Sequence, residues 1–151
     1  VYFEALTLMY RVTTRLAAGA RTRAHLDAMR RHQAAYARAV SDNDVLGMIG
    51  HNRDLHATIA EAGGNPYFTG LFTRLLDEGR RILRLYYYPS FDDQLPRKYV
   101  YEHDAMVGAA NVAIEARDLA LSELLAAQHA DQIVRQIQSY LARDRTREMA
   151  L

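Results

Sequence analysis

The residues best suited to chemistry are one asparagine and a few histidines that stand on apolar stretches of the chain. Asn52 and His56 are four residues apart, so a helix would stack them on one face, one turn apart. Ile49, Ile59 and Ala60 continue that side of the helix. The Asn52–His56 pair is therefore predicted to point into a core and not into water.

Two further histidines, His103 and His129, also stand among apolar residues at helical spacing. The apolar neighbours of His103 are Val100, Met106 and Val107. Those of His129 are Leu125 and Ile133. A buried imidazole needs a partner at both nitrogens, and three converging imidazoles are satisfied more easily by a divalent ion than in pairs. Neutral imidazole suits Zn, Ni, Fe and Cu. A lone inward histidine is usually a hydrogen-bonded part of a core, and that alternative stays open for each of them.

The remaining histidines, His25, His32 and His51, have basic or polar neighbours, and we expect them to be solvated. The composition is that of an ordinary domain, with 50% hydrophobic and 25% charged residues and a net charge of +1. Such a charge gives no general affinity for nucleic acid or membranes. The absence of cysteine excludes disulfides and thiolate sites and is compatible with the cytoplasm, where we expect the protein. No membrane span or signal peptide is predicted, and a start at Val1 without methionine indicates part of a longer protein.

Helical periodicity runs through the whole chain and predicts the elements that must position these side chains. The expected helices cover residues 1–19, 22–40, about 44–62, 66–88, 97–116 and 118–143. A capping cluster at 41–44 opens the third helix, and Gly63-Gly64 followed by Asn65-Pro66 closes it and starts the fourth. The one extended loop is expected at 89–96, between two prolines. The prediction is an all-α antiparallel bundle of about six helices, forming one domain over residues 1–151.

Arginines in the fourth predicted helix are candidates for binding an acid, because guanidinium binds a carboxylate through two parallel hydrogen bonds. Arg80 and Arg84 share a helix face, and Tyr88 lies one turn beyond Arg84. Arg84 with Tyr88 is the preferred pair, and Arg80 is the second candidate. The alternative is a solvated basic side of the helix.

In combination, these residues resemble the FCD-type ligand-binding and dimerisation domain of GntR-family bacterial transcription regulators. The resemblance is carried, in order, by Asn52 and His56, the run 60–65, Glu102-His103, the junction 116–118 and His129. It implies a metal site formed by Asn52, His56, His103 and His129, with a divalent metal such as Zn or Ni. It also implies a small carboxylate effector, a homodimer, and operator DNA bound through an N-terminal winged helix-turn-helix.

Three departures from the FCD pattern affect what can be expected. The winged helix-turn-helix segment is absent from these residues, so contact with operator DNA would need a domain upstream. Asn52 replaces the more usual aspartate, which removes a negative charge from the site. About one extra helical turn lies between His103 and residue 116, around 110–113, and is expected either to shift His103 relative to His129 or to be absorbed in a widened turn.

A metal-dependent hydrolase or oxygenase with three histidine ligands is the alternative function. Such an enzyme needs a general base beside the ion. Glu102 and Asp104 adjoin His103 but point about 100° away from it on a helix, and Glu61 is offset from His56. The expectation is therefore a sensor without catalytic residues.

Overall fold

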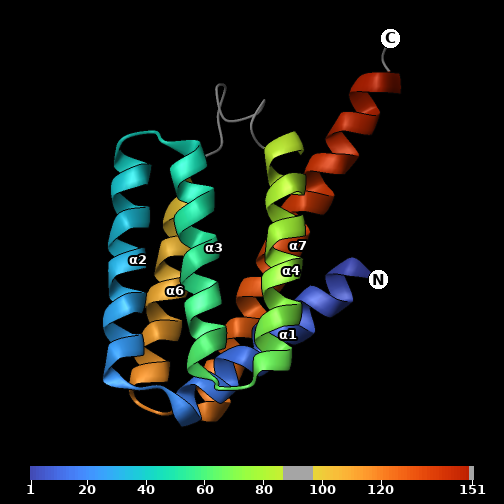
Figure 1. The fold of residues 1–151 in the computed structure, drawn as a ribbon. Coiled ribbons are helices and arrows are strands. Elements are labelled where there is room, and N and C mark those ends of the chain that lie inside the picture. The colour runs from blue at the N-terminus through green and yellow to red at the C-terminus, as the bar shows by residue number, and fades with distance from the viewer. Residues whose placement is uncertain (87–96, 150–151) are drawn as a thin grey trace.

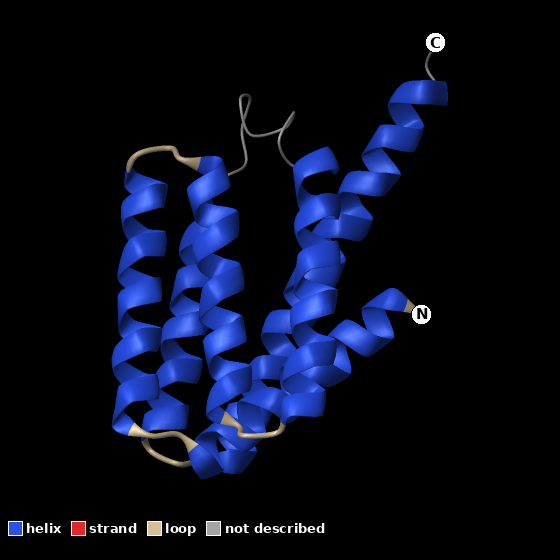
Figure 2. Cartoon of the chain, in the orientation of Figure 1, coloured by secondary structure: helices blue, strands red, loops and turns tan. Residues whose placement is uncertain are grey.

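The computed structural model describes residues 1–86 and 97–149, with the side chains at 1–82, 103–139 and 142. These residues form six helices and no strand (Figure 2). The helices are α1 (Tyr2–Ala20), α2 (Arg23–Ser41), α3 (Val45–Ala62), α4 (Pro66–Tyr86), α6 (Arg97–Glu115) and α7 (Leu119–Met149). The all-α prediction is confirmed.

The helices α2, α3, α4, α6 and α7 alternate in direction along the bundle, and α1 lies obliquely across one end (Figure 1). This oblique helix contacts α3, α4, α6 and α7, while α2 contacts α3 and α6 on the other side. The antiparallel arrangement therefore brings α3, α6 and α7, which carry the candidate histidines, next to the same α1.

Short caps end and begin the helices at the lower end of the bundle in Figure 1. Gly64, with φ +75°, is the left-handed residue of the predicted Gly-Gly corner, whereas Gly63 is still helical with φ −72°. The Asn65 side chain accepts hydrogen bonds from the backbone N–H groups of Tyr67 (3.0 Å) and Phe68 (3.3 Å). Asn65 is thus the cap of α4, as predicted.

Two predicted boundaries differ from the structure or lie outside the described residues. The last helix continues six residues past the predicted end at 143, because residues 144–149 contain neither glycine nor proline and include good helix formers. The expected loop at 89–96 and the end of the fourth helix at Tyr88 lie outside the described residues. The helix α6 is regular α-helix from Arg97 to Glu115, so the alternative of a widened turn around residues 110–113 is wrong.

Two large apolar clusters form the core and divide it between the two sides of the bundle. One joins α1, α4 and α7 with part of α3, and consists of Leu6, Met9, Tyr10, Ala60, Phe72, Leu75, Leu76, Ala126 and Ala130. The other joins α2, α3 and α6 with the end of α1, and consists of Ala17, Leu26, Met29, Leu55, Ile59, Ala62, Val107 and Ile114. Among the described residues, no helix is both long and apolar enough to cross a lipid bilayer.

Candidate metal centre

Three histidines from three different helices meet inside the bundle. His56 on α3, His103 on α6 and His129 on α7 each offer one ring nitrogen, and these nitrogens all lie within 4.8 Å of one another. An ion bound at about 2.0–2.1 Å from each nitrogen needs nitrogens roughly 3–4 Å apart. Side-chain adjustments of a fraction of an ångström would satisfy that requirement, so the three residues fit a divalent ion.

The imidazole rings contact one another directly. His56 and His129 are stacked, with ring centroids 5.2 Å apart and an interplanar angle of 24°. The His103 and His129 rings meet edge to face at 4.7 Å. The extra residues in α6 therefore do not separate His103 from His129, which the sequence had left open.

Two tyrosines support the histidine rings, and the sequence analysis did not identify either of them. Tyr10 of α1 stands edge-on to His56 (4.8 Å between centroids) and to His129 (5.4 Å). Tyr36 of α2 lies against His103 at 5.1 Å. In sequence, both tyrosines have the spacing of ordinary core residues. Their contact with the histidines depends on how α1 and α2 pack against the other helices, which the sequence does not reveal. The two tyrosines therefore pack against all three imidazole rings.

Buried ring nitrogens at the centre have no hydrogen-bond partner among the described residues: His56 Nε2, His103 Nδ1, and both Nδ1 and Nε2 of His129. Leaving such polar atoms unpaired in a core costs about 1–3 kcal/mol each, so an unpaired set usually marks a ligand or ion. This finding counts against the alternative that each histidine is an ordinary hydrogen-bonded part of the core.

Burial also keeps the histidines neutral. Desolvation, with a smaller contribution from His103, lowers the pKa of His56 to about 3, and desolvation lowers the pKa of His103 to about 4. Desolvation and the two neighbouring imidazoles place the pKa of His129 well below its usual value of about 6.5. Since a metal binds the neutral imidazole, protons compete weakly for this site near pH 7.

Asn52 lies one turn before His56 on α3 and is partly buried. Its Oδ1 atom is buried and has no hydrogen-bond partner among the described residues. An amide oxygen in that state is a suitable fourth donor for an ion on the same face. The three-histidine group contains no carboxylate, so a set completed by Asn52 would be uncharged.

Of the predicted acid-binding side chains, only that of Arg80 lies among the described residues. Arg80 is exposed and lies 3.7 Å from the carboxylate of Asp77. The side chain of Arg84 and all of Tyr88 lie outside the described residues, so the preferred pair stays a prediction. The histidines expected in solvent, His25, His32 and His51, are partly exposed, and His25 caps α2 by accepting a hydrogen bond from the backbone N–H of Thr22 at 3.0 Å.

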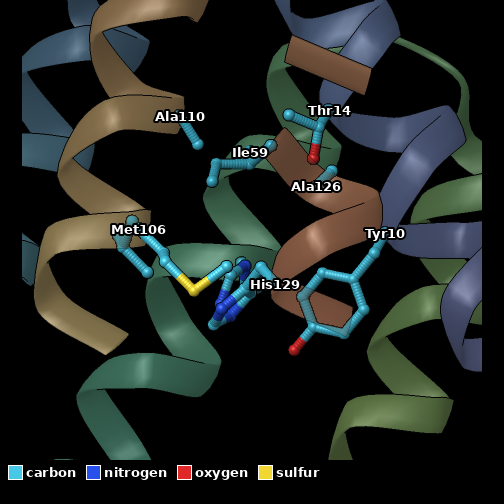
Figure 3. Close-up of a pocket in the computed structure, with 9 residues that line it drawn as sticks. Tyr10, Thr14, Ile59, Met106, Ala110, Ala126 and His129 are labelled. Atoms are coloured by element: carbon cyan, nitrogen blue, oxygen red, sulfur yellow. The ribbon is translucent and has the colours of Figure 1, made fainter. Parts of the chain in front are cut away.

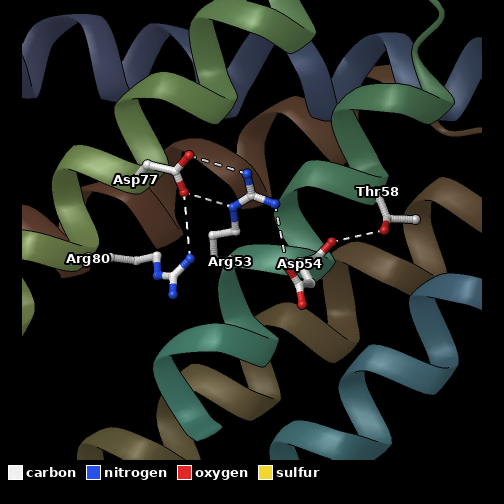
Figure 4. Close-up of polar contacts among 5 residues, drawn as sticks. All are labelled: Arg53, Asp54, Thr58, Asp77 and Arg80. Carbon is white, nitrogen blue, oxygen red and sulfur yellow. Dashed lines mark hydrogen bonds and ion pairs between the residues drawn. The ribbon is translucent and has the colours of Figure 1, made fainter. Parts of the chain in front are cut away.

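An ion-pair network joins α3 to α4 (Figure 4). Arg53, which follows Asn52 in sequence, donates to both carboxylate oxygens of Asp77, through Nε at 2.9 Å and through Nη2 at 3.3 Å. It also donates to Asp54 at 3.4 Å. The network ties the helix carrying Asn52 and His56 to its neighbour.

A small cavity adjoins the histidines (Figure 3). Its volume is about 10 Å³, close to the room that one water molecule needs. The lining residues are Tyr10, Thr14, His56, Ile59, Met106, Val107, Ala110, Ala126 and His129. The wall is therefore mainly aliphatic and aromatic, with ring nitrogens on one side.

The fold and this arrangement of histidines agree with the comparison with known families. No curated protein matches the chain in sequence. A family model described as the FCD domain matches residues 2–132, which covers all three histidines and Asn52. The chain belongs to the FCD family, the C-terminal effector-binding domain of GntR-family regulators.

Proposed function

We propose that this chain is the effector-binding domain of a transcription regulator, and that it senses a small carboxylate at a divalent-metal site. His56, His103 and His129 would hold the ion, with Asn52 as the fourth donor, and Zn or Ni suits this set. The observation that carries the proposal is the convergence of three neutral imidazoles, two buried and one partly buried, each with at least one buried ring nitrogen that has no hydrogen-bond partner among the described residues.

The charge of the site favours an anionic effector. Three neutral imidazoles and one amide leave the charge of a divalent ion uncompensated, and the surrounding core is desolvated. A carboxylate brings the missing negative charge, so it should bind in preference to water. Ion and carboxylate would then strengthen each other's binding by the same factor.

Transmission of the signal would need a dimer and a DNA-binding domain elsewhere in the protein. Large apolar side chains are exposed on several helices, among them Leu8 on α1, Leu71 on α4 and Leu124 on α7, and this surplus apolar surface supports a homodimer. An upstream winged helix-turn-helix would contact operator DNA, and such a regulator would act in the cytoplasm. In this proposal the bound ligand regulates the protein and is not transformed, whereas the alternative is a metal-dependent enzyme.

Metal binding tests the first half of the proposal. Chelator-stripped protein is titrated with Zn²⁺ and with Ni²⁺ in a calorimeter, and we expect one ion per chain. His56→Ala should abolish binding and keep the helical content, whereas His32→Ala, on α2 and away from the centre, should bind as the parent does. Equal binding by the parent and His56→Ala would contradict the proposal.

Carboxylate binding tests the second half. Small monocarboxylates and dicarboxylates are titrated into ion-loaded and stripped protein, and we expect binding only to the loaded form. Acids that bind both forms equally would be held by other groups, and the metal-linked mechanism would be wrong. Sedimentation at micromolar concentration tests the dimer, which a clean monomer would exclude.

A further inference from the structure

We infer that the effector is a monocarboxylate with a short uncharged tail, and that Met106, Ala110 and Ala126 limit the length of that tail. The inference rests on the proposed function, in which the carboxylate lies on the ion. It concerns what is attached to the carboxylate. The observation that carries it is the position and lining of the cavity beside His56 and His129 (Figure 3).

The cavity extends from the histidines toward one end of the bundle. Ile59 follows His56 by one turn on α3, and Ala126 precedes His129 by one turn on the oppositely directed α7. Ala110 lies about two turns after His103 on α6. All three positions lead toward the end where α3 and α6 finish and α7 begins, the lower end of Figure 1. A tail attached to an ion-bound carboxylate has this space beside it.

Among the residues whose side chains the structure describes, no lysine, arginine or acidic residue lines the cavity. Apart from ring nitrogens, its polar groups are the hydroxyls of Thr14 and Tyr10 (Figure 3). A second carboxylate placed here would lose its hydration without gaining a cation, which is strongly unfavourable. The candidate Arg80 does not supply that cation, because its side chain is exposed and paired with Asp77.

The size of the cavity restricts the tail to a few carbon atoms. With a volume of about 10 Å³ it holds about one water-sized group as it stands. Met106 forms one wall, and an unbranched thioether side chain can change rotamer to admit further methylenes. Ala110 and Ala126 border the space with single methyl groups, and larger residues at these positions would fill it.

Calorimetric titration of the Zn²⁺-loaded chain with acids of graded length tests the inference. From acetate to propanoate to butanoate, we expect affinity to rise up to about fourfold per methylene, the equivalent of about 0.8 kcal/mol. Hexanoate should bind more weakly than butanoate. Succinate, which matches butanoate in carbon number, should bind at least about tenfold more weakly because its second carboxylate is buried without a cation.

Two variants connect these preferences to the cavity wall. Ala110→Val should narrow the space and lower the butanoate-to-acetate affinity ratio about tenfold, whereas Ala109→Val, at the neighbouring exposed position of α6, should leave the ratio unchanged. Met106→Ala should widen the space and move the preferred length toward hexanoate. If Ala110→Val fails to fold, the Met106→Ala series still decides the question.

The outcomes separate this inference from the proposed function. Succinate binding more tightly than butanoate, with both requiring Zn²⁺, would overturn the short-tail inference and leave metal-linked sensing intact. Unchanged length preference in Ala110→Val and Met106→Ala would also overturn it. Failure of every acid to bind the Zn²⁺-loaded chain would overturn the proposed function and the inference together.

Discussion

Arg53 on α3, which follows Asn52 in sequence, binds both carboxylate oxygens of Asp77 on α4. The Arg53 side chain is 24% exposed and the Asp77 side chain 50% exposed, so this is a partly exposed ion pair whose strength comes from its two parallel hydrogen bonds. We expect Asp77→Asn to lower the free energy of unfolding by about 0.5–1 kcal/mol in urea denaturation. Asp131→Asn is the control, because Asp131 pairs with Arg135 on one exposed helix and should contribute about 0.3–0.5 kcal/mol at most. A larger loss in the control would contradict this assignment.

Replacing Asn52 with aspartate should raise the affinity for the ion and lower the affinity for the acid effector. The new carboxylate adds a negative charge to a neutral donor set, so the ion should bind more tightly. The acid effector should bind more weakly, because the charge it supplies is already present. Calorimetry of the ion and then of acetate or butanoate measures both changes. Tighter binding of both ligands by Asn52→Asp would show that charge compensation does not link them.

Acid should destabilise the ion-free protein. The unfolded chain protonates its histidines near pH 6.5, whereas the folded pKa is lowered to about 3 for His56 and about 4 for His103. Between these values the unfolded state binds more protons, so stability is fully present above pH 6.5 and declines as the pH falls toward 4 and 3. Each histidine contributes a slope of up to about 1.4 kcal/mol per pH unit. Urea midpoints from pH 7 to pH 4 measure the slope, and His56→Ala should make it shallower.

The close contact between Gly79 and Tyr2 predicts an unusual effect of alanine in α4. A Cβ at Gly79 would lie 2.7 Å from the hydroxyl of Tyr2, which is held by a 2.8 Å hydrogen bond to the carbonyl of Leu75. Gly79→Ala should therefore destabilise the protein although alanine favours helix. Gly70→Ala, with open space around it, should stabilise the same helix by about 0.5–1 kcal/mol. Thermal unfolding compares the two, and Tyr2→Phe should rescue Gly79→Ala.

The sequence predicted the helices and the inward faces that carry His56 and His129, for a common physical reason. Each helix buries one face, so residues three and four apart reveal both the helix and the side of it that points inward. His56 and His129 were identified by this criterion, and both are buried, with exposures of 4% and 3%. The capping residues are equally local, which is why the Gly64–Asn65 corner could be predicted.

The groups around the histidines could not be predicted because they depend on how the helices cross. Tyr10 and Tyr36 come from helices whose own periodicity carries no information about a site on α3, α6 and α7. The pairing of Arg53 with Asp77 likewise depends on the relative position of α3 and α4. The first helix shows the limit most clearly: its apolar residues Val12 and Leu16 are only half-buried, whereas the polar residues Thr13 and Thr14 are buried.

Unequal enclosure of the three histidines has a consequence for how fast an ion would exchange. His56 and His129 are buried, while His103 keeps part of its surface accessible to solvent. An incoming ion or a chelator would therefore meet His103 first, and the bonds to the two enclosed imidazoles would form last and break last. The lifetime of the bound ion would then be set by the opening of α6 away from α3 and α7, so it could be long even where equilibrium affinity is modest.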